Sequence, residues 1–160
     1  MEFWKASDEI HKMVRDLIGQ NHPDLATIAG DIIVVFREKA RKSGGQTVYG
    51  TVNRASSISN ALLNEDHKFI LVVGADQWEN TLTGRQKEAL LDYLLCACRA
   101  DEDQSTGDVK IHIARPDFVA FRENIERYGI WYPKETNNSA SGDPKDGQGA
   151  LEEELEKDGP

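Results

Sequence analysis

Cysteine is scarce in this chain of 160 residues, which has only two, Cys96 and Cys98. Residues two positions apart on a helix point to opposite sides, so this pair does not suit a structural disulfide, and a reducing compartment fits best. The sequence also lacks an apolar run of the roughly 20 residues that a membrane-spanning helix needs. Its acidic first residues do not form the apolar segment of a signal peptide. We therefore expect a cytoplasmic protein with no membrane partner.

Positive charge is also in short supply. The chain holds 19 lysine and arginine residues against 28 acidic residues, for a formal net charge of −9. Residues 134–160 contain eight acids, three lysines and almost no large apolar residue. Such a segment cannot bury enough surface to offset its ordering entropy, so we expect one domain at residues 1–133 and a disordered acidic tail at 134–160. Residues 151–157 could instead form a helix on a partner.

Hydrophobic residues make up 39% of the chain and follow patterns typical of both helices and strands. Residues 31–37 form a near-continuous branched run typical of a buried strand, whereas residues 3–18 carry apolar positions at helical spacing, with Ser7 as a predicted cap. In chain order we expect a helix at 3–18, a strand at 31–37, a turn at 42–46, strands at 47–54 and 69–73, a helix at 82–98, a polar loop at 101–107, an edge strand at 109–114 and a helix at 117–128. This order indicates an α+β domain with a small mixed sheet.

The most informative segment is the predicted helix at 82–98. Thr83 and Gln86 form a predicted capping box, in which the threonine oxygen accepts a hydrogen bond from the third backbone N–H while the glutamine reaches back. Apolar residues follow at helical spacing, at Leu90, Leu91, Leu94, Leu95 and Cys98. We therefore expect a helix with one face in the core.

This helix resembles the zinc helix of the phage metallopeptidase family, in which a leucine-threonine opening and a Gln-Arg/Lys-Glu-Ala-Leu-Leu-Asp run precede a His-Glu-Leu-Cys-His segment. That last segment corresponds to Tyr93-Leu94-Leu95-Cys96-Ala97 here. Further stretches resemble other parts of the family, at residues 36–45, 49–52, 69–78, 115–121 and 127–131. The resemblance covers most of the chain. It implies a zincin-like fold and a phage or prophage origin, and hence the cytoplasm of a host bacterial cell.

The resemblance also implies a zinc site, but this sequence departs from it at the positions that carry the chemistry. In the H-E-x-x-H pattern two histidines one turn apart hold zinc, and the glutamate acts as general base. Here Tyr93 replaces the first ligand, Leu94 the base and Ala97 the second ligand. Pro116 or Asp117 stands where the family carries a third ligand, a histidine. We therefore expect no catalytic residue and no cofactor, because the zinc ligands are absent.

A rebuilt metal site elsewhere in the chain is the alternative. Its candidate ligands are Cys96, Cys98, His67 and His112. A Cys-x-Cys pair on a helix diverges by about 200°, which argues against a shared metal. We favour Cys98 as a core residue and Cys96 as a partly exposed thiol.

Three further polar residues lie near the predicted helices. His11 and His22 belong in or just after the first helix, and we interpret both as surface histidines. Asp92 matches the family's aspartate before the first ligand. Without a base or a metal beside it, we expect Asp92 to lie on a solvated helix face or to bond a neighbouring strand.

One basic patch stands out in this acidic chain. It comprises Arg37, Lys39, Arg41, Lys42 and Arg54, with Tyr49 among them. These cations could contact nucleic-acid phosphates while Tyr49 stacks on a base. We favour a charged edge that discourages aggregation between strands, because the chain's overall charge opposes approach to nucleic acid.

Two functions remain open. We expect a catalytically inactive family member that binds or modulates a host or phage protein. The alternative is a zinc-dependent peptidase or other hydrolase with a displaced or rebuilt site. Metal content separates the two, since an enzyme of the family type purifies with about one zinc per chain.

Overall fold

The structure is a computed structural model that describes residues 1–115 and 122–131. The predicted third-ligand positions Pro116 and Asp117, and the predicted acidic tail at 134–160, lie outside the described residues. In chain order the elements are β1 (Phe3–Lys5), α1 (Asp8–Asn21), the 3-10 helix η1 (Pro23–Asp31), β2 (Ile32–Arg37), β3 (Arg41–Ser43), β4 (Gln46–Val48), β5 (Gly50–Arg54), α2 (Ser57–Leu63), β6 (Phe69–Gly74), α3 (Ala75–Asn80), α4 (Gly84–Ala97), β7 (Cys98–Glu102), β8 (Val109–Ile113) and α5 (Arg122–Tyr128).

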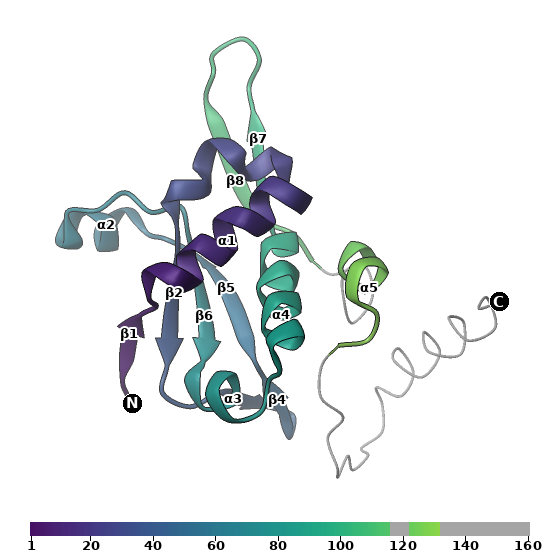
Figure 1. Cartoon of the computed structure of the whole chain (residues 1–160). Coiled ribbons are helices and arrows are strands. Elements are labelled where there is room, and N and C mark those ends of the chain that lie inside the picture. Colours follow the sequence, from purple (N-terminus) through teal and green to yellow (C-terminus); the bar gives the residue numbers. More distant parts are fainter. Residues whose placement is uncertain (116–121, 132–160) are drawn as a thin grey trace, which may run out of the picture.

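A four-stranded mixed sheet forms the centre of the fold, with strand order β1-β2-β6-β5. β2 runs parallel to β6, and the two outer strands pair antiparallel with their neighbours. Helices α1 and α4 lie across one face of this sheet (Figure 1). Along β6, Phe69, Leu71 and Val73 are buried while Ile70 and Val72 are half-buried, so the main core lies between the sheet and these helices. The predicted α+β class is confirmed.

Helix α4 begins as the sequence predicts. Thr83 Oγ1 accepts a hydrogen bond from Gln86 N at 3.2 Å, and Gln86 Oε1 accepts one from Thr83 N at 3.0 Å, which completes the capping box. Both donors would otherwise lack partners in the first turn. The apolar side of the helix, including Leu91 and Leu95, is buried in the main core. The chain then enters β7 directly at Cys98.

The N-terminal segment differs from its prediction. Phe3–Lys5 form an edge strand that pairs with Arg37, Phe36 and Val35 of β2, so the predicted helix at 3–18 begins too early. The helix starts after Ser7, which caps it as predicted, and continues to Asn21. In this strand the backbone N–H and C=O groups find partners at the edge of the sheet. The spacing of apolar residues in the sequence does not reveal such a pairing.

Other departures are confined to short elements. The predicted strand at 47–54 is divided between β4 and β5, and β7 extends into the predicted loop at 101–107. Elements η1, α2 and α3 were not predicted; each is short or lacks a long apolar period. The strand expected at 109–114 is confirmed as β8. None of the helices in the described ranges is long and apolar enough to cross a membrane.

Candidate functional site

The three positions that correspond to zinc ligands and base lie on α4, and none carries an imidazole or a carboxylate. Leu94 is 1% exposed and belongs to the main core. Ala97 is buried in a small cluster with Cys96. The half-buried Tyr93 ring lies 6.2 Å from the Trp131 ring, and burial raises the pKa of its phenol above the usual value. This side of α4 is therefore packed with apolar and aromatic groups.

The adjacent face of α4 holds a buried polar network centred on Asp92. Its Oδ1 accepts hydrogen bonds from Asn21 Nδ2 at 3.1 Å and His22 Nε2 at 2.8 Å. Its Oδ2 accepts from Asn124 Nδ2 at 2.9 Å and Arg127 Nη1 at 2.5 Å. Since these donors come from the end of α1 and from α5, one carboxylate links three helices.

The charge of Asp92 is stabilised although the side chain is buried. Burial alone would raise its pKa, but hydrogen bonds from His22 and Asn124 and electrostatic attraction to His22 and Arg127 outweigh that effect. They hold the pKa of Asp92 below its ordinary value of 3.8. Trp131 Nε1 in turn donates to Asn124 Oδ1, and Asn124 also donates to the Ala89 carbonyl oxygen at 3.0 Å.

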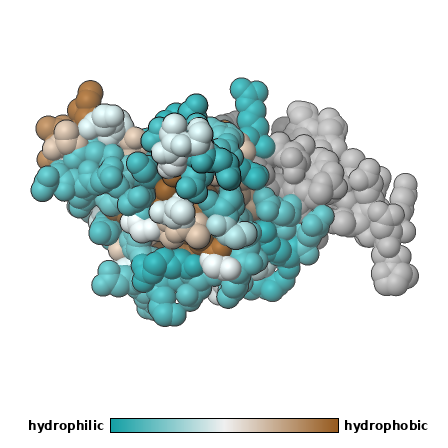
Figure 2. All heavy atoms as spheres, turned by 90° about the horizontal axis from the view of Figure 1, so that it is seen from above, coloured by the Kyte–Doolittle hydropathy of each residue, from teal (hydrophilic) through white to brown (hydrophobic). Residues whose placement is uncertain are grey.

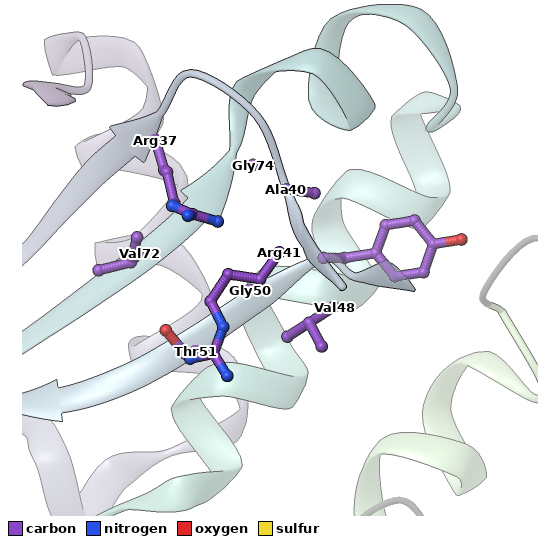
Figure 3. A pocket seen from close by; sticks show the side chains of 9 residues that line it. Arg37, Ala40, Arg41, Val48, Gly50, Thr51, Val72 and Gly74 are labelled. Atoms are coloured by element: carbon purple, nitrogen blue, oxygen red, sulfur yellow. The ribbon is translucent and has the colours of Figure 1, made fainter. Parts of the chain in front are cut away.

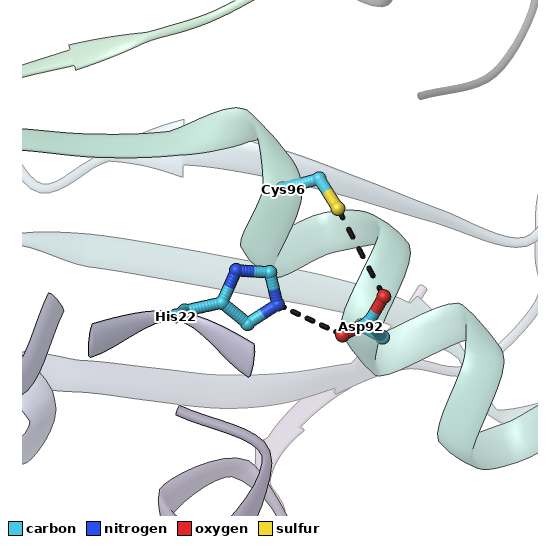
Figure 4. Close-up of side chains that lie close together, drawn as sticks. All are labelled: His22, Asp92 and Cys96. Carbon is cyan, nitrogen blue, oxygen red and sulfur yellow. Dashed lines mark hydrogen bonds and ion pairs between the residues drawn. The ribbon is translucent and has the colours of Figure 1, made fainter. Parts of the chain in front are cut away.

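Cys96 completes this network and makes it a possible metal centre. Its Sγ lies 3.9 Å from Asp92 Oδ2, one helical turn away (Figure 4). His22, Asp92 and Cys96 are all buried, and each offers a ligand atom within 4.8 Å of the other two. An imidazole, a carboxylate and a thiolate are a donor set that zinc accepts. These residues could therefore hold a metal, whose binding would displace the bond between His22 and Asp92 and the contacts of Arg127 Nη1 with Asp92 Oδ2 and Cys96 Sγ.

The prediction of a chain without metal ligands is wrong for this reason. His22, interpreted as a surface histidine, is 4% exposed, and Asp92 faces helices instead of solvent or a strand. Cys96, expected to be partly exposed, is buried, and burial together with the negative charges of Asp92 and Glu123 raises the pKa of its thiol well above the usual range. Cys98 is a core residue, as predicted.

The other candidate ligands of the rebuilt site do not meet. His67 pairs with Glu65, and His112 lies 3.8 Å from Asp101 on the β7–β8 hairpin. His11 Nε2 accepts a hydrogen bond from Val34 N. The spacing of Asp92 and Cys96, which places both on one helix face, was the available signal for the cluster. Nothing local indicated His22, which lies 70 positions away from Asp92.

Comparison with protein families places the chain in one of them. Residues 2–141 match the family described as Putative phage metallopeptidase. The chain belongs to this family. No curated protein and no solved structure matches it significantly. The resemblance stated from the α4 segment is therefore confirmed over most of the chain, and this member of the phage metallopeptidase family carries a metal-capable cluster beside the altered positions.

The predicted basic patch is only partly assembled in this metallopeptidase-like chain. Arg37, Arg41, Tyr49 and Thr51 line one small hollow at the end of the sheet (Figure 3). Lys39 and Lys42 are exposed beside it. Tyr49 is half-buried and packs against the main core, which limits it as a stacking surface. Arg54 lies at the opposite end of β5, paired with Phe69.

Proposed function

We propose that this member of the phage metallopeptidase family does not hydrolyse peptides and acts by binding a host or phage protein. The observation that carries the proposal is the burial of Leu94. Its side chain occupies the position of the family's general base and is buried in the core of the domain. A substitution of that kind removes the base and also fills its space with hydrocarbon.

Hydrolysis by a zinc peptidase requires more than a bound metal. The metal must keep an open coordination position for water, and a base must lie within reach of that water. Tyr93 and Ala97 offer no imidazole for the metal, and Leu94 offers no oxygen for the proton. Packing of Tyr93 against Trp131 closes the same side of the helix.

The neighbouring cluster of His22, Asp92 and Cys96 has the character of a closed site. The side chains of His22 and Asp92 are 5% and 0% exposed, and Cys96 is 1% exposed. A metal held by these three residues would supply a cross-link between the end of α1 and α4, as structural zinc sites do. A peptide could not reach it without opening the contact between these helices.

Helix α2 carries the two most exposed large hydrophobic residues of the described chain, which suit a protein partner. Ile58 and Leu62 are 73% and 80% exposed and lie one turn apart on α2. This helix projects from the side of the domain in Figure 1, and its hydrophobic patch is visible at the left edge of Figure 2. Two large apolar residues held outside the core favour burial against an apolar groove of another protein.

A hydrolysis assay tests the loss of catalysis. The purified chain is incubated with a fluorescent unfolded protein substrate, with about one equivalent of zinc and with a chelator in parallel. We expect no cleavage above background in either condition. Chelator-sensitive cleavage by the wild-type chain would overturn the proposal.

The binding half of the proposal requires a separate experiment. The wild-type chain, Leu62→Lys and Arg15→Gln are immobilised and exposed to lysate of a bacterial host. We expect the wild-type chain and Arg15→Gln to retain one protein that Leu62→Lys does not retain. Arg15 is an exposed residue of α1 and serves as the control. Identical retention by all three would refute the assignment of α2.

A second candidate is a metal-dependent hydrolase whose site has moved to His22, Asp92 and Cys96. The mutual distances of these donor atoms favour it. Zinc titration of chelator-treated protein separates the two functions when Cys96→Ala is compared with Cys98→Ala, a buried cysteine outside the cluster. Zinc binding lost only in Cys96→Ala, without cleavage, supports a closed site. Cleavage lost only in Cys96→Ala supports the relocated enzyme.

A further inference from the structure

Two arginines line the same hollow on the side of the sheet opposite α1 and α4. Arg37 ends β2 and Arg41 begins β3, and the Arg41 side chain extends toward Thr51 of β5 while that of Arg37 enters the hollow from the end of β2 (Figure 3). Arg37 and Val72 belong to the strand positions that alternate with the buried core residues. The hollow therefore lies outside the core, where a ligand can reach it.

The cations around this hollow form no salt bridge within the described part of the chain, although the Asp76 carboxylate lies close by, accepting a hydrogen bond from the backbone N of Ala40 at 2.8 Å. In residues 1–115 and 122–131, no ion pair involves Arg37, Lys39, Arg41, Lys42 or Arg54. Arg37 donates one hydrogen bond from Nη1 to the Lys39 carbonyl oxygen at 3.1 Å, and Lys42 Nζ donates to Thr47 Oγ1 at 3.2 Å. Residues 37–54 contain five cations and one acid, in a chain whose net charge is −9. Such local excess is repulsive unless an anion binds.

The donor groups suit a phosphate group at the mouth of the hollow, whose interior of about 10 Å³ has room for about one water molecule. Guanidinium groups present several N–H donors in a planar fork that matches phosphate oxygens, and two of them face one hollow here. The Thr51 hydroxyl supplies a further donor on the same lining. Lys39 and Lys42 are also exposed and add positive charge in the same segment of the chain.

An exposed aromatic ring lies beside the arginines. Phe3 of β1 is paired directly with Arg37 in the antiparallel register, so both side chains are on the same face of the sheet. The Phe3 side chain is among the exposed large hydrophobic residues, at 57%. An exposed ring next to phosphate-binding arginines is how proteins hold unpaired bases by stacking.

We propose that this face binds single-stranded nucleic acid, with a backbone phosphate at the mouth of the hollow lined by Arg37, Arg41 and Thr51 and a base on Phe3. The proposal goes beyond the proposed protein-binding function and uses a different surface from α2. In this proposal the exposed Phe3 has the stacking role that the sequence predicts for Tyr49, because Tyr49 packs against the core. The negative charge of the whole chain opposes association, so binding is strongest at low ionic strength.

Fluorescence anisotropy with a labelled oligothymidine of about 15 nucleotides tests the proposal, because this length covers a typical single-strand site. The double variant Arg37→Gln/Arg41→Gln is compared with Lys12→Gln/Arg15→Gln, which removes the same charge from exposed positions on α1. We expect the first to weaken binding about tenfold or more. Its slope of log affinity against log salt should be shallower by about 1.4, since two phosphate contacts are lost. The control should retain wild-type affinity.

Phe3→Ala separates stacking from charge. We expect it to weaken binding about tenfold while leaving the salt slope unchanged, because stacking involves no counterion release. Arg41→Gln alone guards against misfolding of the double variant, because Arg41 is exposed on a hairpin and supports no core contact. It should shift the slope by about half as much.

Several outcomes would overturn the inference. These are no binding by the wild-type chain at low salt, equal losses in the arginine and control pairs, and an unchanged affinity in Phe3→Ala. Competition distinguishes sources of the anion. Displacement by unlabelled single strands but not by inorganic phosphate at equal phosphate concentration supports an extended strand. Equal displacement by polyaspartate, or equal binding to anionic phospholipid vesicles, would show general attraction to anions and refute the assignment.

Discussion

Replacement of Asp92 by asparagine tests whether one carboxylate links α1, α4 and α5. The native side chain satisfies four donors, two on each oxygen. Asparagine keeps one oxygen and places an N–H₂ group against two of the donors. Two buried polar contacts are then lost, and the positive charge of Arg127 keeps only its ion pair with Glu123.

The expected destabilisation follows from these losses. Breaking a buried ion pair by removing one partner costs about 3–5 kcal/mol. The Arg127 side chain is 23% exposed, so water recovers part of its solvation and we expect the lower end, about 3 kcal/mol. For a domain of this size such a change lowers Tm by about 10 °C.

Urea unfolding followed by circular dichroism measures this free energy, with Asp16→Asn as the matched control. Asp16 forms an i,i+4 pair with Lys12 on the surface of α1, with both side chains more than half exposed, so its loss should cost about 0.5 kcal/mol or less. A double-mutant cycle with Arg127→Met should give a coupling of at least about 1 kcal/mol. A cost for Asp92→Asn no larger than that of Asp16→Asn would refute the network's role.

Three further predictions concern stability. The pKa of Asp92 is lower in the folded than in the unfolded chain, so its contribution to the free energy of unfolding is present above the unfolded pKa and is lost as the pH falls through the folded pKa. Acid titration below about pH 4 should therefore destabilise the wild-type chain more than Asp92→Asn. Parallel acid curves for the two proteins would contradict this. Gly74→Ala should lower the free energy of unfolding by about 1–3 kcal/mol, because the added Cβ would lie 2.6 Å from the Ala40 Cβ. Gly84→Ala, whose added Cβ would meet nothing within 4 Å, should be neutral or stabilising. Equal urea midpoints for the two variants would count against the close packing at Gly74. Thr83→Ala should cost about 1 kcal/mol through loss of the capping box, and a change of less than about 0.3 kcal/mol in thermal unfolding would speak against that bond.

The sequence predicted the elements that local patterns determine. β2 and β6 are apolar runs of branched residues, and α4 carries both its capping pair and its apolar face within one segment. Local patterns cannot reveal a strand such as Phe3–Lys5, because its partner strand lies 30 or more residues further along. The helix periodicity that begins near Ile10 was therefore extended too far toward the N-terminus.

Only the part of the candidate site that lies within one short segment of the sequence could be predicted. The altered positions Tyr93, Leu94 and Ala97 lie within five consecutive residues, so their loss of ligand chemistry was evident. The Asp92 network draws on His22 and Arg127, from opposite ends of the described chain. A histidine after a helix gives no sign of burial until the chain has folded around it.

Anomalous X-ray diffraction from crystals grown with zinc tests the central claim most directly, because it locates the metal irrespective of activity. The account predicts no zinc on the side of α4 that carries Tyr93 and Ala97, and any zinc inside the domain in contact with Cys96. A zinc ion about 2 Å from the Tyr93 oxygen, with an open position for water, would contradict it.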